Sequence, residues 1–289
     1  MTGFETALNE ITLVLFTTLA PSGIVAYALM ALTLLRADGE RAKRLNALLL
    51  MPFLVCLGGL VASATHLGNP DNALYVFAKV GSSPLSTEVA AAVAFLGAAG
   101  LQWLYQFAEH ARPWLGKALL VAAVIAGMGF LASIAMAYAS RTVMTWYTPL
   151  VPAALVLNAC IGGPLLALAG FAFSGFGTRR RALALSIASL AALVANVAVY
   201  VAQAGILEGM GNGIVTAVQL APDYRAGIVL FSALCLMAIA LDAAAVVRAQ
   251  GRSRRLRIAV VAAAMLAFAG IFVMRFMFYM THMTAGISL

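Results

Sequence analysis

The chain has 289 residues, of which 64% are hydrophobic and only 10% are charged, and its mean hydropathy is +1.00. Soluble domains carry about 25% charged residues, so this composition excludes a soluble enzyme, a disulfide-rich secreted scaffold and a disordered chain. Eighteen basic and ten acidic residues give a formal charge of +8. In a membrane protein such an excess orients the chain in the bilayer, and we expect no nucleic-acid partner.

Eight stretches are long and apolar enough to cross a membrane, because a helical span needs about 20 mostly apolar residues. They must be helices, since only helices and closed barrels satisfy the backbone in lipid and a barrel would show short alternating strands. We predict an all-α integral membrane protein with a single membrane domain over residues 1–289. In chain order the predicted spans are 11–35, 45–65, 87–107, 115–139, 149–173, 183–204, 226–247 and 257–280.

The basic residues collect in alternate loops. Fourteen of the eighteen lie in the first, third, fifth and seventh connections. By the positive-inside rule these connections are cytoplasmic, which predicts that both termini lie on the outer side. The residues concerned are Arg36, Arg41, Lys43, Arg44, Arg112, Lys117, Arg179, Arg180, Arg181, Arg248, Arg252, Arg254, Arg255 and Arg257.

The second four spans echo the first four. The first and fifth spans each carry a helix-breaking motif, Pro21-Ser22-Gly23 and Gly162-Gly163-Pro164, because proline inside a helix removes a hydrogen bond and kinks it. The third and seventh spans each open with a proline and an acid. This pattern indicates a possible parallel repeat, 1–145 and 146–289, and its simplest architecture is two four-helix bundles side by side.

A histidine and a glutamate fall at the same predicted depth on the outer face. His66 ends the second span and can exchange a proton near neutral pH. Ser83 as N-cap and Pro84 at the first helical position predict a helix start that puts Glu88 near the positive end of the helix dipole. This pair suits an oxidation that releases protons from a lipid-soluble hydroxyl compound. The alternative is that His66 caps a helix and Glu88 is a solvated interfacial acid.

Arg275 lies inside the outer end of the last span. A charge there should either snorkel to the interface or pair with Glu88, Asp223 or a ligand oxygen. Several aromatic residues at the same face could line a ring-binding pocket, but an interfacial aromatic belt explains them as well. These are Trp146, Tyr147, Tyr224, Phe278 and Tyr279.

The sequence predicts no metal or haem site in this chain. None of the three histidines, His66, His110 and His282, is near a predicted midplane, and a haem between helices usually needs two that face each other. Three cysteines form no C-x-x-C pair, so no zinc or iron–sulfur site is indicated.

Several blocks of sequence, in this order, resemble the membrane anchor subunit of the dimethyl sulfoxide reductase family. The resemblance covers essentially the whole chain and the same number of spans. The blocks near His66, Glu88 and His282 are long and specific, whereas the spans between them are generic. The blocks are His66-Leu67-Gly68-x-Pro70-x-x-Ala73, Val80-Gly81-x-Ser83-x-Leu85-Ser86-x-Glu88, Thr145-Trp146-Tyr147, Gly163-Pro164-Leu165-Leu166, Pro222-Asp223-Tyr224 and Arg275-x-x-Phe278-Tyr279-x-x-His282-Met283-Thr284-x-Gly286.

The resemblance implies a multi-pass anchor in the bacterial inner membrane for an iron–sulfur electron-transfer subunit and a molybdopterin catalytic subunit. It implies oxidation of menaquinol near the periplasmic face, without haem, in anaerobic respiration. The family's quinol-site histidine and glutamate fall on His66 and Glu88. Arg275, Tyr279 and His282 complete the expected quinol-binding set, with Arg275 and Tyr279 stabilising a developing negative oxygen.

One segment departs from the family pattern. The family has a Gly-Gln-Cys type segment early in the first span, where this chain has Leu19-Ala20-Pro21-Ser22, and this difference could alter the quinone type or the pocket shape. Related anchors also serve tetrathionate, selenate, polysulfide or sulfite enzymes, so the terminal acceptor stays open.

Two other functions stay open from the residues alone. A small-solute transporter would place polar groups at mid-depth, and the chain offers few there. Asn158 and Asn196, the clearest of them, are expected to form interhelical hydrogen bonds; Thr17 and Thr18 are the others. The second alternative is a non-catalytic tether, in which the outer motifs only dock a partner.

Overall fold

The structure is a computed structural model that describes residues 2–65, 70–248 and 254–284. Within this part, eight helical segments are long and apolar enough to cross a membrane and no β-strand forms, which confirms the predicted all-α class and spans. The segments are α2 (Ile11–Leu34), α3 (Glu40–Leu48) joined to α4 (Leu50–Ala64), α5 (Pro84–Tyr105), α6 (Pro113–Ala137), α7 (Leu150–Ser174), α8 (Arg179–Glu208), α10 (Tyr224–Arg248) and α11 (Arg254–Met280). Shorter elements are α1 (Gly3–Asn9), η1 (Pro70–Lys79) and α9 (Ala217–Leu220).

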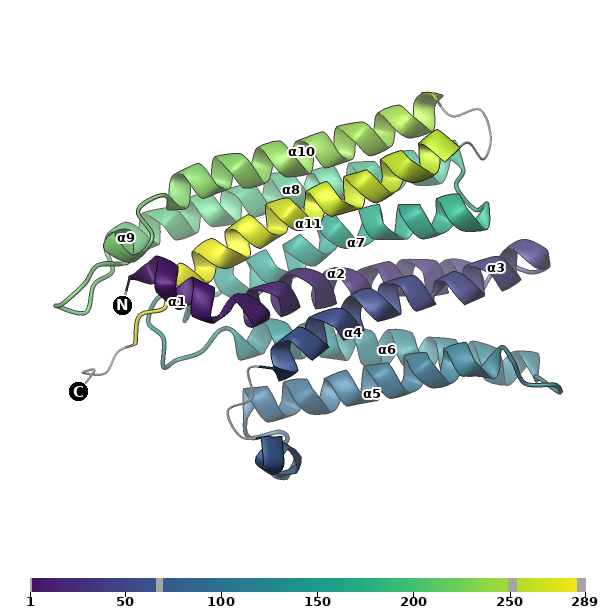
Figure 1. The fold of residues 1–289 in the computed structure, drawn as a ribbon, viewed down its shortest axis with the longest axis horizontal. Helices are drawn as coiled ribbons and strands as arrows, with labels where there is room; N and C mark the ends of the chain where they lie inside the picture. The colour runs from purple at the N-terminus through teal and green to yellow at the C-terminus, as the bar shows by residue number, and fades with distance from the viewer. Residues whose placement is uncertain (1, 66–69, 249–253, 285–289) are drawn as a thin grey trace.

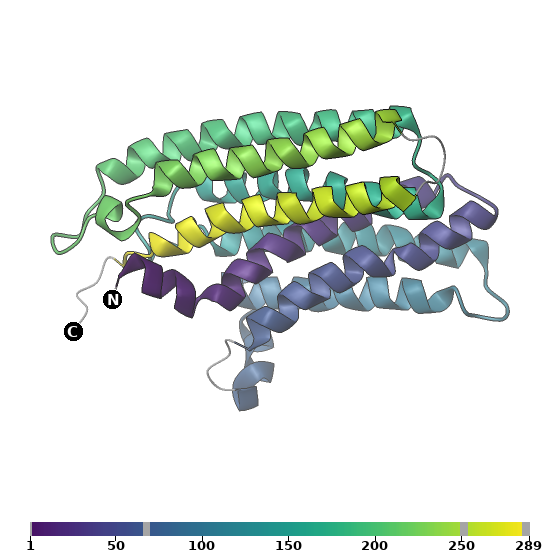
Figure 2. The same cartoon turned by 45° about the horizontal axis from the view of Figure 1, so that its top comes forward.

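The spanning helices run side by side, and the connections sort to two ends (Figure 1). The loops after α2, α5 and α7 share one end. Predicted cytoplasmic arginines lie in these loops or in the helix turns next to them, so we call this end the arginine-rich end. Helix α1, helix α9 and the end of α11 share the opposite, arginine-poor end, where η1 projects beside the start of α5 (Figures 1 and 2). Which end faces the cytoplasm, and the two-bundle arrangement, stay predictions.

Helices α2 and α7 form the core of the molecule. Helix α2 packs on α4, α6, α7 and α11, and α7 packs in turn on α8 and α11. The two predicted helix-breaking motifs meet where α2 crosses α7: a Cβ atom at Gly162 would overlap the Ser22 hydroxyl, and one at Gly163 would lie 2.5 Å from Val25 Cβ. Both helices run through their prolines, so these small residues serve close helix packing, as is common in membranes.

This close approach predicts the effect of one added methyl group. Gly163→Ala should reduce the free energy of unfolding of the purified chain in detergent by about 1–3 kcal/mol, because the new Cβ forces α2 and α7 apart. Gly129→Ala is the matched control, since Gly129 is exposed on α6 and has open space at its Cβ position. Equal stability of the two variants would contradict the packing argument.

Buried polar side chains are more numerous than the sequence suggested. The expected interhelical bonds are confirmed, because Asn196 Nδ2 donates to Asn158 Oδ1 (2.8 Å) and Asn158 Nδ2 donates to Tyr200 Oη (2.8 Å). However, Asp242 is also fully buried, toward the arginine-rich end of α10, and accepts a hydrogen bond from Ser186 Oγ of α8 (2.9 Å). The described helices therefore bury more polar groups than the few mid-depth residues that the sequence singled out.

Candidate functional site

Glu88 is positioned by the start of α5. Ser83 is the N-cap, and its hydroxyl accepts from the Ser86 amide at 3.4 Å, while Pro84 opens the helix, as predicted. Glu88 lies one turn later and is only 7% exposed. The alternative of a solvated interfacial acid is therefore wrong, because this face of α5 packs into the protein.

Arg275 lies on the inner face of α11 and is 2% exposed. Its Nε donates to the Thr17 hydroxyl of α2 at 2.9 Å, and its guanidinium carbon stands 4.1 Å from the centre of the Phe278 ring. Its Nη2 has no hydrogen-bond partner among the described residues. Arg275 therefore does not snorkel, because its helix face is enclosed by α2.

The carboxylate partners expected for Arg275 are not found. In the described part of the chain, Arg275 forms no ion pair with Glu88 or Asp223, and Asp223 is exposed. Of the candidate partners, a ligand oxygen is the one that the spare Nη2 donor still accommodates.

Tyr138, which follows α6, contacts Arg275 and Tyr279 and interacts electrostatically with Glu88. Its ring centre lies 6.0 Å from that of Tyr279, and the Arg275 guanidinium carbon lies 5.3 Å from the Tyr138 ring. Burial raises the pKa of Tyr138 well above its usual value; Tyr279 and Glu88 raise it further, and Arg275 opposes them. The Tyr138 hydroxyl therefore stays protonated at neutral pH. We call Thr17, Glu88, Tyr138, Arg275 and Tyr279 the Arg275 cluster.

Tyr279 contributes a second buried hydroxyl to this cluster. The residue is 1% exposed, and its phenol interacts with Tyr138 closely enough to raise the pKa of Tyr138. Even so, Tyr279 Oη forms no well-aligned hydrogen bond within the described residues. The cluster thus holds Arg275 Nη2, which has no hydrogen-bond partner among the described residues, and a buried Tyr279 hydroxyl whose polar neighbours are the other members Thr17, Tyr138 and Arg275.

An aromatic wall covers the cluster at the arginine-poor end. Trp146 stacks on Phe278 with ring centres 4.4 Å apart, and its Nε1 donates to the Phe278 carbonyl at 3.2 Å. The Thr145 hydroxyl donates to the Thr281 carbonyl at 2.6 Å. The loop before α7 is thereby fixed to the end of α11. These contacts come from inside the protein, so a lipid-facing belt does not describe Trp146 or Phe278.

The other aromatic residues predicted at this end are either buried in the protein or exposed at its surface. Tyr224 and Tyr279 are also buried, and only Tyr147, which is 53% exposed, has the position expected of a belt residue.

The two predicted histidines have different outcomes. His282 lies at the exposed rim, with its ring centre 5.0 Å from that of Trp146. This packing partly buries the imidazole and lowers its pKa, although Glu10 opposes the shift, so the ring is neutral at pH 7. His66 lies outside the described residues. The structure therefore brings Arg275 and Tyr279 together, places Glu88 close enough to Tyr138 for an electrostatic interaction, and leaves His282 at the rim.

The sequence analysis did not identify Tyr138 or Glu10, which acts electrostatically on His282. It also did not identify Thr17 as the hydrogen-bond partner of Arg275. Tyr138 lies at the outer end of the predicted fourth span, which could have identified it, and its ring centre is 6.2 Å from that of Trp146. Nothing local marks Thr17, because its hydroxyl also donates to the Leu13 carbonyl at 2.9 Å, which is ordinary for a threonine in a membrane helix.

The cluster can bind an oxygen atom that gains negative charge and can accept a proton. An arginine and two protonated phenols supply donors where low dielectric strengthens their interactions. The carboxyl group of Glu88, which interacts electrostatically with Tyr138, is a candidate general base. Such a set suits a small hydroxyl compound that reaches the protein from the lipid.

Comparison with known proteins identifies the family to which the protein belongs. A family model described as the DMSO reductase anchor subunit (DmsC) matches residues 4–280. An anaerobic dimethyl sulfoxide reductase subunit of Escherichia coli K12 is 29% identical over 283 residues, which cover 97% of each protein. The subunit of the same name from Haemophilus influenzae is 30% identical over 81% of this protein and 84% of its own length. A second E. coli subunit of anaerobic dimethyl sulfoxide reductase, YnfH, is 29% identical over 75% and 76%. The protein belongs to the family of DMSO reductase anchor subunits, which are multi-pass membrane proteins that anchor a reductase complex.

Proposed function

We propose that this protein oxidises menaquinol, a lipid-soluble quinol, at the Arg275 cluster and passes the electrons to an iron–sulfur subunit. That partner would relay them to a molybdopterin catalytic subunit of the dimethyl sulfoxide reductase type. Membership of the anchor family supports a role in such a complex. The positive-inside rule supports an orientation in which the arginine-poor end, and with it the cluster, faces the periplasm.

The observation that carries the proposal is a buried arginine with an unused donor. Moving a cation out of water costs several kcal/mol, and a single hydrogen bond with aromatic contacts returns only part of that. Ionisable groups retained inside a membrane protein mark functional sites by default. Arg275 has an Nη2 with no hydrogen-bond partner among the described residues, and its guanidinium carbon lies 5.5 Å from the Tyr279 ring centre, so it has a donor that a quinol oxygen could use.

In the proposed reaction, one quinol loses two electrons and two protons to become a quinone. Glu88 accepts one proton and His66 the other, while Arg275 and Tyr279 stabilise the negative oxygen that forms as the first proton leaves. The two electrons would pass to the docked partner subunit, whose iron–sulfur clusters would supply the one-electron acceptors. Both protons leave on the side where the partner binds, so the step moves little net charge across the membrane.

The role of His66 is tested in the assembled complex. His66→Ala should abolish quinol-dependent reduction of the terminal acceptor but leave reduction by an artificial dye donor intact, because the dye delivers electrons directly to the partner subunits. His110→Ala, a histidine at the arginine-rich end, should change neither rate. If quinol turnover survives His66→Ala, His66 is structural. If wild-type complex neither retains quinone nor oxidises quinol, the protein is a tether.

A further inference from the structure

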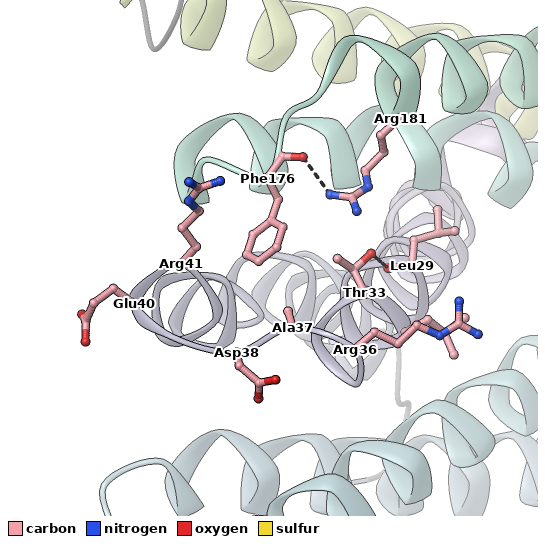
Figure 3. A pocket seen from close by; sticks show the side chains of 10 residues that line it. Leu29, Thr33, Arg36, Ala37, Asp38, Glu40, Arg41, Phe176 and Arg181 are labelled. Carbon is pink, nitrogen blue, oxygen red and sulfur yellow. Dashed lines mark hydrogen bonds between the residues drawn. The ribbon is translucent and has the colours of Figure 1, made fainter.

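A cavity of about 700 Å³ lies at the arginine-rich end, far from the Arg275 cluster. The end of α2, the start of α3 and the loop between α7 and α8 form it (Figure 3). Its lining combines three arginines with apolar side chains, and the residues that matter here are Leu29, Leu32, Arg36, Arg41, Phe176 and Arg181. Nothing in the quinol reaction uses this cavity.

The charge of the lining is positive. Arg181 is held in place, because its Nη1 donates to the Phe176 carbonyl at 2.7 Å and its guanidinium carbon lies 4.9 Å from the Phe171 ring centre. Arg36 and Arg41 form no ion pair with another described residue. Their guanidinium groups are therefore available to a ligand.

Two acids also line the cavity, but they do not neutralise it. Glu40 pairs with Lys43 at 2.8 Å, so the three lining arginines and this lysine together carry four positive charges against the two negative charges of Asp38 and Glu40. In Figure 3 the carboxylates of Asp38 and Glu40 extend away from the Phe176 loop, toward which Arg41 and Arg181 reach from two sides.

The first turn of α3 adds to the positive potential. Its N-cap is Gly39, which adopts φ +78 and gives the helix no side-chain hydrogen bond. The amides of a helix N-terminus and the helix dipole attract anions. Three guanidinium groups beside such a helix start favour a phosphate group, whose oxygens accept paired N–H donors from arginine.

The apolar part of the lining indicates the source of that phosphate. Leu32 belongs to the spanning part of α2 and is 52% exposed, so the cavity opens beside surface that faces lipid. We propose that this cavity binds the phosphate headgroup of an anionic phospholipid, with its acyl chains beside Leu32. Basic pockets between membrane helices bind such headgroups in general, whereas a soluble anion would gain nothing from the apolar wall.

The test measures lipid binding to the delipidated complex in detergent. Native mass spectrometry would count bound cardiolipin, phosphatidylglycerol and zwitterionic phosphatidylcholine at matched concentrations. The double variant R36Q/R41Q should bind the anionic lipids about 30-fold more weakly, which follows from about 1 kcal/mol for each arginine. The matched control is R44Q/R180Q, which removes two exposed positive charges from the same end but outside the cavity lining.

Three results would overturn the proposal. Equal weakening in R36Q/R41Q and R44Q/R180Q would mean that diffuse surface charge attracts the lipid. Equal binding of zwitterionic and anionic lipids would exclude a phosphate-selective headgroup site. Displacement of the lipid by millimolar inorganic phosphate would identify a soluble anion as the occupant. Dye-driven and quinol-driven activities should match wild type in both double variants, which shows that each complex is folded.

Discussion

Replacing Arg275 by glutamine is expected to lower kcat/KM for quinol oxidation by about 100- to 1,000-fold, the usual effect of removing one donor that stabilises a developing oxyanion. Glutamine keeps a neutral hydrogen-bond donor but loses the positive charge and the paired geometry of the guanidinium. The measurement is the rate of quinol-driven reduction in the assembled complex, divided by the rate that an artificial dye supports in the same sample.

Stability gives an independent check on the role of Arg275. A buried cation with one hydrogen bond, to Thr17, contributes little net stability, because its interactions mostly offset the loss of hydration. Replacing it by methionine, which fills similar space without a charge, should therefore leave the amount of assembled complex unchanged or raise it. Quinol oxidation by this variant should fall at least as far as in the glutamine variant.

Two further variants separate a binding role from a structural one. Arg275→Lys keeps the charge without the fork of donors, so its quinol activity should lie between wild type and Arg275→Gln. Arg225→Gln removes an exposed arginine at the same end, one that pairs with Glu208, and should leave the quinol rate unchanged. If Arg275→Gln reduces dye-driven and quinol-driven rates equally, Arg275 acts on assembly and not on the quinol.

The membrane spans were predictable because the thickness of the bilayer sets the length of each apolar stretch in the sequence. A helix must remain apolar for about 20 residues whatever its neighbours are, and every predicted span overlaps an observed one. Local chemistry also fixed the start of α5, since Ser83 and Pro84 act within a single turn. The local sequence does not show which helix packs against which. The motif with Gly162 and Gly163 therefore suggested a break in the helix, whereas in the structure these glycines allow α2 and α7 to pack closely.

The candidate site was predictable only in part. Glu88, Arg275 and Tyr279 stood out because ionisable and phenolic groups are rare inside spans. Their distances to one another depend on helices that are distant in sequence. The sequence therefore suggested two carboxylate partners for Arg275 that the structure does not show, and it missed Tyr138. Asp242 was missed for another reason: a single acid near a span end resembles an interfacial residue, and only the packing of α8 against α10 shows that it is buried beside Ser186.

Glu88→Gln is the second variant with a large expected effect. Its amide has nearly the same shape as the carboxyl group but accepts no proton from the quinol, and loss of a positioned general base usually lowers a rate by about 100- to 10,000-fold. We expect quinol-driven turnover to fall within this range while dye-driven turnover is unchanged. Glu88→Asp, which keeps a carboxylate on a shorter side chain, should recover part of the rate.

The control and the pH profile make this prediction specific. Asp223→Asn removes an exposed acid at the same end and should not alter quinol turnover. With Glu88 as the proton acceptor, the wild-type rate should rise with pH as this carboxyl ionises, and Glu88→Gln should lose that rise. If the variant stays slow but keeps the wild-type pH dependence, another group accepts the proton and Glu88 only positions the substrate. His66 would then be the sole base, and His66→Ala should remove the pH dependence instead.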